Sequence, residues 1–411
     1  MAPPDGLAGS PVLLLGWNGG RAAAALAAAG SRVVCAVAPS EAPSARAAGE
    51  TVVVADPADA EAVLAGLARS GRRPRGFAAV AAAHESAVVT AAVLAQLGGA
   101  ASLPVETALA LRDKDVQKRL VRAAGVATAR SAVVAASAEV PLTELRFPVV
   151  VKPLNGDAGT GADLLRSAAH ARTWTYRAAC DGPWQVEEFV SGSEVHLDGV
   201  VRAGEVTALA VSRYLRNVLD TRDGAPMGSV VADPGRDPAL YRDGRALAAR
   251  AVTALGHREG VFHLEAFRRP DGELVFGECA GRVAGGRIDE AVHRKLGVDL
   301  HAQWAAALLG LPGPAAAPAA RSEAFGYVLL SAPPGIVDEA PATDDILARE
   351  GVVSAERARR TRGARTGRPV AFTAVRAVLT GKDEEQVTRR AEDLAEWFHG
   401  WNGAAVRRAG G

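Results

Sequence analysis

Two glutamates near the middle of the sequence are strong candidates for metal chemistry. Glu265 lies in the strand-like run 263–267, and Glu278 ends the strand-like run 273–278. The residues 270–272, Pro-Asp-Gly, are typical of a turn, so the sequence predicts a β-hairpin. A loop of two or four residues would place both carboxylates on one sheet face, as opposite or diagonal neighbours. Carboxylates that close repel unless a cation lies between them, and hard oxygen ligands that share phosphates suit Mg²⁺.

Two cationic side chains would join this face of the hairpin. His263 precedes Glu265 by two positions, and Arg282 shares the face if the second strand continues past Glu278. Gly281, Gly285 and Gly286 then mark a loop in which the backbone can approach a ligand. The plain alternative is an exposed sheet face with mixed charges.

A lysine followed by a glycine-rich loop suggests a phosphate site. Lys152 ends the hydrophobic strand 149–152, and the loop 155–161 has the sequence Asn-Gly-Asp-Ala-Gly-Thr-Gly. Small residues let backbone N–H groups approach phosphate oxygens. An unpaired lysine in an apolar strand is costly, so Lys152 requires an anion. The loop is no Walker A motif, because no Gly-Lys-Ser/Thr closes it, and a plain turn stays open as the alternative.

Acidic residues also accompany the strand-like runs 184–190 and 194–198. The second run alternates polar and apolar residues, as in a half-exposed strand. Glu188 and Glu194, each taken alone, are equally typical of solvated surface positions.

The elements around these residues indicate an α/β protein. In the first hundred residues, strand-like segments (12–15, 32–37, 51–54, 77–82) alternate with helix-like segments (21–29, 60–69, 86–97). This alternation predicts a doubly wound parallel sheet whose ligand face lies at the carboxyl ends of its strands. The turn 16–20 departs from G-x-G-x-x-G, so it favours a turn beside a small substrate over an NAD site.

Further along, a charged helix is expected over 112–124 and a Pro/Ala-rich linker over 311–320. Strands over 324–331 and 371–379 and a closing helix over 384–398 follow.

Composition excludes several classes of protein. Lys+Arg 47 against Asp+Glu 46 leaves a net charge of +1, which provides no field to attract nucleic acid or anionic lipid. The run of arginines between 357 and 368 contains no aromatic residue to stack on bases, so we expect a solvated loop or lid edge. Three widely spaced cysteines favour a reducing compartment, and no apolar run is long enough to span a membrane. We expect a cytoplasmic protein.

In their order and spacing, these pieces resemble the ATP-grasp superfamily of ATP-dependent carboxylate–amine (or thiol) ligases, over about residues 10–310. The resemblance implies a Rossmann-like pre-ATP-grasp domain over 1–105 with the doubly wound parallel sheet. It implies an ATP-grasp domain over 106–310, made of a small α+β lid at about 146–204 and a larger α+β nucleotide and metal domain. The linker 311–320 and a small carboxy-terminal α/β subdomain over 321–411 would follow.

The resemblance also assigns roles to residues of this sequence. The ATP-binding residues would be the two lysines Lys114 and Lys152, the mobile loop Ala158, Gly159, Thr160 and Gly161, the adenine-reading strand Glu187, Glu188, Phe189 and Val190, and the ribose carboxylate Glu194. Glu265 and Glu278 would hold one or two Mg²⁺ ions, with Mn²⁺ as a substitute. Arg282 would lie beside an acyl phosphate and act in catalysis with Lys152.

One position departs from the pattern of the superfamily. Many members have Asn two residues after the second metal carboxylate, where this chain has Ala280. Binding of a second Mg²⁺ is therefore left open. His263-x-Glu265 and the Arg282-x-x-Gly285-Gly286 pattern look closest to the amino-acid and dipeptide ligase branch.

The resemblance implies a C–N bond-forming ligase that uses ATP and an acyl phosphate to join a small carboxylate, an amino acid or small peptide, to an amine. A bicarbonate-using carboxylase, a degenerate ATP-binding regulatory protein and an NAD-dependent oxidoreductase are the alternatives. The acceptor pocket is expected to draw on segments at strand ends: the turn near Trp17 and Asn18, His84 and Glu85 after the strand 77–82, and the loops around Arg213 and Arg287. Substrate identity, a homodimer and the role of 321–411 are left open.

Overall fold

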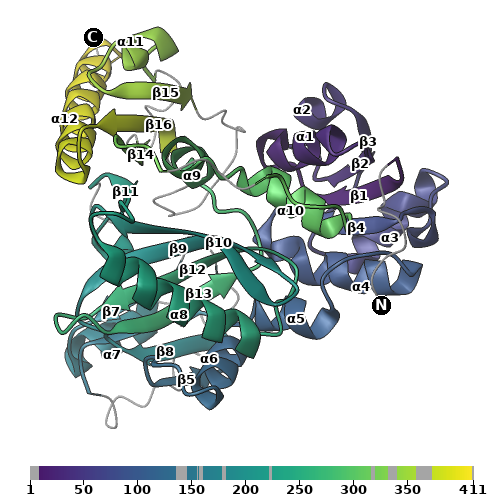
Figure 1. The fold of residues 1–411 in the computed structure, drawn as a ribbon, viewed down its shortest axis with the longest axis horizontal. Coiled ribbons are helices and arrows are strands. Elements are labelled where there is room, and N and C mark those ends of the chain that lie inside the picture. Colours follow the sequence, from purple (N-terminus) through teal and green to yellow (C-terminus); the bar gives the residue numbers. More distant parts are fainter. Residues whose placement is uncertain are drawn as a thin grey trace.

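The structure, a computed structural model, describes residues 9–135, 146–154, 156, 161–177, 182–221, 225–315, 320–331, 340–357 and 373–409. Within these residues the strands form three sheets, one eight-stranded and two four-stranded (Figure 1). We call them the large sheet, the amino-terminal sheet and the lid sheet.

The amino-terminal sheet is parallel, in the order β3-β2-β1-β4. Its strands are β1 (Pro11–Leu15), β2 (Arg32–Val37), β3 (Glu50–Val53) and β4 (Ala79–Ala82), and its helices are α1 (Arg21–Ala28), α2 (Ala42–Arg46), α3 (Ala60–Arg69) and α4 (Val88–Gly98). Leu13 and Leu15 pack into one apolar cluster and Val12 and Leu14 into another, because successive side chains point to opposite faces. The predicted parallel sheet is confirmed.

The lid sheet is antiparallel, in the order β5-β8-β6-β7. It contains β5 (Ser131–Val134), β6 (Val149–Pro153), β7 (Asp163–Leu165) and β8 (Trp184–Glu188), with α7 (Ala168–Arg177) beside it. The helices α5 (Val105–Ala110) and α6 (Lys114–Ala123) connect it to the amino-terminal sheet. The lid range of 146–204 stays a prediction, and this sheet begins before it, at Ser131, and ends at Glu188.

The large sheet is antiparallel and runs β13-β12-β9-β10-β11-β14-β16-β15. Its strands are β9 (Ser193–Arg202), β10 (Glu205–Tyr214), β11 (Met227–Val231), β12 (Gly260–Arg268), β13 (Leu274–Ala280), β14 (Ala324–Ser331), β15 (Val352–Arg357) and β16 (Thr373–Gly381). Its helices are α8 (Pro238–Ala254), α9 (Ile288–Leu296), α10 (Leu300–Leu308), α11 (Thr343–Leu347) and α12 (Glu384–Ala409). Because β14 pairs with β11, the carboxy-terminal strands extend the sheet that carries the candidate metal residues.

Element boundaries differ from the predictions in a few places. The closing helix α12 continues to Ala409, beyond the predicted end at 398, and α6 begins at Lys114, because Asp113 is its N-cap. Asp113 accepts hydrogen bonds from the N–H groups of Asp115 and Val116. Among the described residues, no helix is both long and apolar enough to cross a bilayer.

Candidate active site

A cavity of about 430 Å³ lies where the three sheets approach one another. The candidate residues that line it are Lys114, Lys152, Glu187, Glu188, Phe189, Val190, Glu194, Glu265, Glu278 and Arg282. Residues that follow β1 and β4 of the amino-terminal sheet, namely Asn18, His84 and Glu85, also line the cavity. Two residues of β14, Tyr327 and Leu329, complete the lining. The structure therefore brings together the predicted residues that it describes, apart from Gly161, which does not line the cavity.

Glu265 and Glu278 lie directly opposite each other on β12 and β13, as predicted. The predicted loop length was wrong, because five residues separate these strands, and a β-bulge restores the pairing. The bulge lies at Gly277, where an added Cβ would approach Glu265 O to 2.8 Å. The extra residue shifts the register by one and so turns Glu278 onto the face of Glu265.

Lysines from two elements converge on Glu278. Lys114 Nζ is 3.4 Å and Lys152 Nζ 3.9 Å from its Oε2 atom. Burial works to raise the pKa of Glu278, but the charges of Lys114 and Lys152 outweigh it and lower this pKa to about 2. The carboxylate therefore stays ionised throughout the physiological range. It is suited to bind a cation.

Glu194 has the opposite electrostatics. Burial, and then the negative charge of Glu265, raise the pKa of Glu194 to about 8. Its Oε2 accepts a hydrogen bond of 2.7 Å from the N–H of Val218, and its own N–H donates to Asn217 Oδ1 at 2.8 Å. A carboxylate that is held at the cavity wall and readily protonated can accept or donate hydrogen bonds to hydroxyl groups.

A second lysine of α6, which the sequence reasoning missed, also belongs to this charge cluster. Lys118 Nζ lies 3.2 Å from Glu187, whose carboxylate also pairs with Lys152 at 2.8 Å. Burial works to raise the pKa of Glu187, but the charges of the two lysines outweigh it, so this pKa lies below its usual range. The signal was available in the sequence, because Lys114 and Lys118 are spaced by four and so share one helix face.

Gln117 fixes that face of α6 against β13. Its side-chain amide donates to Cys279 O at 2.8 Å and accepts from Cys279 N–H at 2.9 Å. The residue after Glu278 is therefore tied to the helix that carries the lysines.

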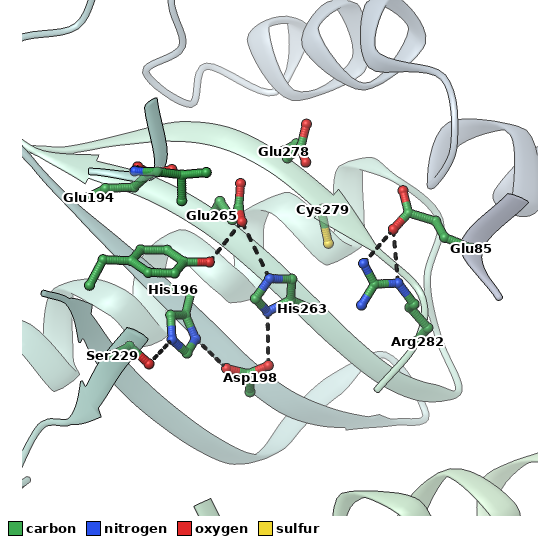
Figure 2. A network of polar contacts seen from close by, with 12 residues as sticks. Glu85, Glu194, His196, Asp198, Ser229, His263, Glu265, Glu278, Cys279 and Arg282 are labelled. Atoms are coloured by element: carbon green, nitrogen blue, oxygen red, sulfur yellow. Dashed lines mark hydrogen bonds and ion pairs between the residues drawn. The ribbon is translucent and has the colours of Figure 1, made fainter. Parts of the chain in front are cut away.

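A buried polar network underlies Glu265 (Figure 2). Asp198 lies between two histidines, 2.6 Å from His196 Nδ1 and 2.9 Å from His263 Nδ1, and His263 Nε2 lies 3.5 Å from Glu265. Burial works to lower the pKa of His263, but the charge of Asp198 raises it to about 10. Tyr214 donates to Glu265 Oε1 at 2.9 Å. Because these contacts fix the Glu265 carboxylate, they orient it toward the cavity.

Sequence reasoning placed His263 on this face but missed Asp198, His196 and Tyr214. They come from β9, which pairs with β12, and from β10, which pairs with β9, and no local pattern revealed these pairings.

The residues present fit Mg²⁺. Glu265 and Glu278 supply hard oxygen donors from paired strands, and both line the cavity. Ala280 adds no side-chain donor of its own at the third position.

At the other side of the cavity, Arg282 joins the large sheet to the amino-terminal sheet (Figure 2). Its Nε and Nη2 atoms donate to Glu85 Oε2 at 2.8 and 2.6 Å. β13 ends at Ala280, so the strand itself does not reach Arg282.

The segments expected at the acceptor pocket reach the cavity, although some of their side chains do not. Asn18, His84 and Glu85 line it, as do Tyr214 beside Arg213 and Gly286 and Ile288 beside Arg287. The residues Trp17, Arg213 and Arg287 themselves do not line it. Arg213 instead pairs with Asp237 and Glu384, and Arg287 pairs with Glu290 and Glu356. Both arginines therefore lie near strand ends, but their long side chains extend to acidic partners instead of to the cavity. Ala158, Gly159 and Thr160 of the predicted mobile loop lie outside the described residues.

No protein-family model matches the sequence. Among curated proteins, an L-arginine-specific L-amino acid ligase of Bacillus subtilis is 25% identical over 225 residues, which cover 53% of this chain and 54% of that protein. D-alanine–D-alanine ligase A of Mesorhizobium japonicum is 31% identical over 186 residues, 41% of this chain and 51% of that protein. The chain therefore matches about half the length of these curated relatives.

Solved structures resemble nearly the whole chain. The L-amino acid ligase of Bacillus licheniformis has a TM-score of 0.72 at 16% identity and covers 94% of this chain and 97% of its own. The carboxyaminoimidazole ribonucleotide synthase of Aspergillus clavatus, solved with ATP, has a TM-score of 0.75 at 17% identity, with coverages of 95% and 99%. At these identities the likeness establishes the fold, and the fold class expected from the sequence is confirmed.

Proposed function

We propose that this chain, which belongs to the ATP-grasp superfamily, is an ATP-dependent ligase that joins a carboxylate to an amine through an acyl phosphate. The single observation that carries the proposal is the pair Glu265 and Glu278, opposed on one cavity wall with Lys114 and Lys152 beside it. This arrangement matches the needs of a reaction that moves a highly charged phosphoryl group.

ATP would occupy the part of the cavity between the lid sheet and the large sheet. The lining there consists of Glu187, Glu188, Phe189 and Val190. Glu194 also lines the cavity and would accept hydrogen bonds from the ribose hydroxyl groups. Lys152 and Lys114 would neutralise phosphate oxygens, and they are already held by carboxylates in this structure. Gly161 and the residues before it would close over the phosphates.

Glu265 and Glu278 would hold Mg²⁺, or Mn²⁺ in its place, and the ion would supply charge neutralisation on the phosphate oxygens. Whether the site binds one ion or two depends on whether other oxygen atoms replace the side-chain ligand that Ala280 lacks. Arg282 would stabilise the tetrahedral intermediate that forms when the amine attacks the acyl carbon. Closure of the lid would exclude water, which otherwise hydrolyses an acyl phosphate.

The substrate is proposed to be an amino acid or a small peptide. The relatives named as L-amino acid and D-alanine ligases support this class. The cavity lining combines Glu85 and Arg282 with the apolar side chains of Ile288 and Leu329, which suits a small zwitterion with an apolar side chain.

The test is release of ADP and phosphate from Mg-ATP in the presence of pooled amino acids. Release that requires particular amino acids, with the corresponding amide product, is expected. Release with bicarbonate alone would replace the proposal with a carboxylase. ATP binding without turnover across the panel would favour a regulatory protein.

A further inference from the structure

His84, a histidine at the acceptor end of the cavity, is held by the carboxylate of Glu41. The reaction described above gives neither residue a role. His84 follows β4, lines the cavity and has a partly exposed side chain. Its Nε2 atom lies 2.9 Å from Glu41 Oε1. Glu41 comes from the loop after β2, so the pair joins the carboxyl ends of two strands.

This geometry defines the proton positions on the ring. A carboxylate only accepts hydrogen bonds, so Nε2 carries the proton that Glu41 binds, and Nδ1 of the neutral ring is left as an acceptor. Among the described residues, no hydrogen bond to Nδ1 is found. Burial works to raise the pKa of Glu41, but the hydrogen bond from His84, together with backbone hydrogen bonds, outweighs it, so this pKa lies below its usual range. Glu41 therefore remains an anion that orients the ring.

The turn after β1 is shaped to admit the ring. Gly16 has φ +83°, and an added Cβ there would lie 2.1 Å from His84 Cδ2. The N–H of Trp17, the next residue, donates to Glu41 Oε1 at 3.3 Å. Both the space for His84 and the position of its carboxylate partner are thus built by one turn.

The other ionisable groups nearby are engaged in other contacts. Glu85 accepts two hydrogen bonds from Arg282, and Arg112 lies 3.7 Å from it. Lys114 and Lys152 pair with Glu278. His84 combines exposure to the cavity, an orienting carboxylate and an acceptor nitrogen.

We infer that His84, oriented by Glu41, is the general base that deprotonates the amine substrate. The inference rests on the proposed ligase function. An amine enters as an ammonium ion, and one of its protons moves to His84 Nδ1. The nitrogen lone pair then forms the C–N bond to the acyl carbon, the C–O bond to phosphate breaks, and phosphate leaves with that electron pair. The second proton of the nitrogen leaves with phosphate, and His84 returns its own to solvent.

Hydroxylamine separates this step from formation of the acyl phosphate. It is uncharged at neutral pH, so it attacks an acyl phosphate with no prior removal of a proton and yields a hydroxamate. The experiment compares amide formation from two amino acids with hydroxamate formation from one amino acid and hydroxylamine, both with Mg-ATP. The variants are His84→Gln, Glu41→Gln and, as a matched control, His399→Gln, which changes an exposed residue of α12.

We expect His84→Gln to lower the rate of amide formation by about 10²–10³-fold and to leave hydroxamate formation within about twofold of wild type. Glu41→Gln should give a smaller loss with the same selectivity, because the ring remains but is no longer fixed. Thermal unfolding and ATP binding of the variants are measured alongside, and both should match wild type.

Equal losses of both products, or no loss of amide formation, would overturn the assignment of His84 alone. Absence of both products with wild-type protein across the amino-acid panel would overturn the proposed ligase function and, with it, this assignment.

Discussion

The two ends of the cavity are built in different ways. The end where we propose that phosphates bind, called the phosphate end (Lys114, Lys152, Glu265, Glu278), consists of side chains on strands and on the first turn of a helix, with ion pairs from the lysines to Glu278. The acceptor end (His84, Glu85, Arg282, Tyr327, Leu329) gathers loop residues after β4 and β13 and two residues of β14. In the proposed reaction, the rigid elements would hold the charges that phosphoryl transfer requires, a step common to many ligases. The loops and the distant strand β14 of the acceptor end can differ from one ligase to another according to the substrate. The predictions below test this division.

The largest effect is expected at the phosphate end. Glu278→Ala and Lys152→Ala should each lower ADP formation by at least about 10³-fold, because each removes a charge that faces the phosphates. ADP release with saturating amino acid measures it. Glu273→Ala, on the same hairpin but exposed and paired with Arg269, is the matched control and should remain active. Unchanged turnover in Glu278→Ala would contradict the metal assignment.

Within the acceptor end, Arg282→Lys should lower kcat by about 10²-fold, although the charge is kept. A lysine cannot reproduce the two hydrogen bonds from the guanidinium to Glu85. Steady-state kinetics with varied ATP should show an unchanged KM for ATP. Arg269→Lys, at the exposed hairpin turn, serves as the control. A rise in the KM of Arg282→Lys for ATP would contradict the assignment of Arg282 to the acceptor end.

At the acceptor end, Leu329→Ala should raise the KM for the amino-acid substrate about tenfold and leave the KM for ATP unchanged. Leu329 lines the cavity, whereas its neighbour Leu330 points into the core beneath α12. Leu330→Ala is therefore the paired control: it should lower the thermal midpoint and leave both KM values near those of wild type. Equal KM changes in the two variants would show that the strand acts through stability alone.

The smallest effect concerns two carboxylates of the same wall that have opposite pKa shifts. The folded-state pKa of Glu194 is raised from 4.5 to about 8, so its contribution to stability is complete below pH 4.5 and is lost as the pH rises to 8. The folded-state pKa of Glu278 is lowered from 4.5 to about 2, so its contribution is present above pH 4.5 and is lost as the pH falls to 2.

Thermal unfolding of metal-free protein across pH should therefore separate the two residues. Glu194→Gln should flatten the loss of stability between pH 4.5 and 8, and Glu278→Gln should flatten the loss below pH 4.5, each by a few degrees in Tm. Glu273→Gln is the exposed control. Identical pH profiles for the Glu194 and Glu278 variants would contradict the opposite pKa shifts, and with them the lowering of the Glu278 pKa by Lys114 and Lys152.

Much of the phosphate end could be predicted from the sequence, because its signals are local. The turn at 270–272 predicts the hairpin that pairs the strands of Glu265 and Glu278. The parallel amino-terminal sheet follows from apolar runs that alternate with Ala-rich helices. Even here, the register depends on the bulge at Gly277, which the sequence reasoning did not identify.

The acceptor end could not be predicted to the same extent. Strand ends correctly indicated Asn18, His84 and Glu85 and the segments around Arg213 and Arg287, but they did not show which side chains of those segments face the cavity. Arg213 and Arg287 themselves pair with acidic residues of α12 and β15 as well as of nearby segments. Tyr327 and Leu329 were not expected at all, because they reach the cavity only through the pairing of β14 with β11.

By itself, the sequence determined which segments are strands and helices, which residues carry charge, and which two strands form the hairpin that carries Glu265 and Glu278. These properties depend on side-chain periodicity and turn preferences over a few residues. Only the tertiary structure decided that Lys118 and Lys152 share Glu187, that Asp198 lies between two histidines, and that Glu41 holds His84. Each of those contacts joins segments far apart in the chain. A buried charge is tolerated only where the whole fold supplies its partner, so its position follows from the packing of all the elements together.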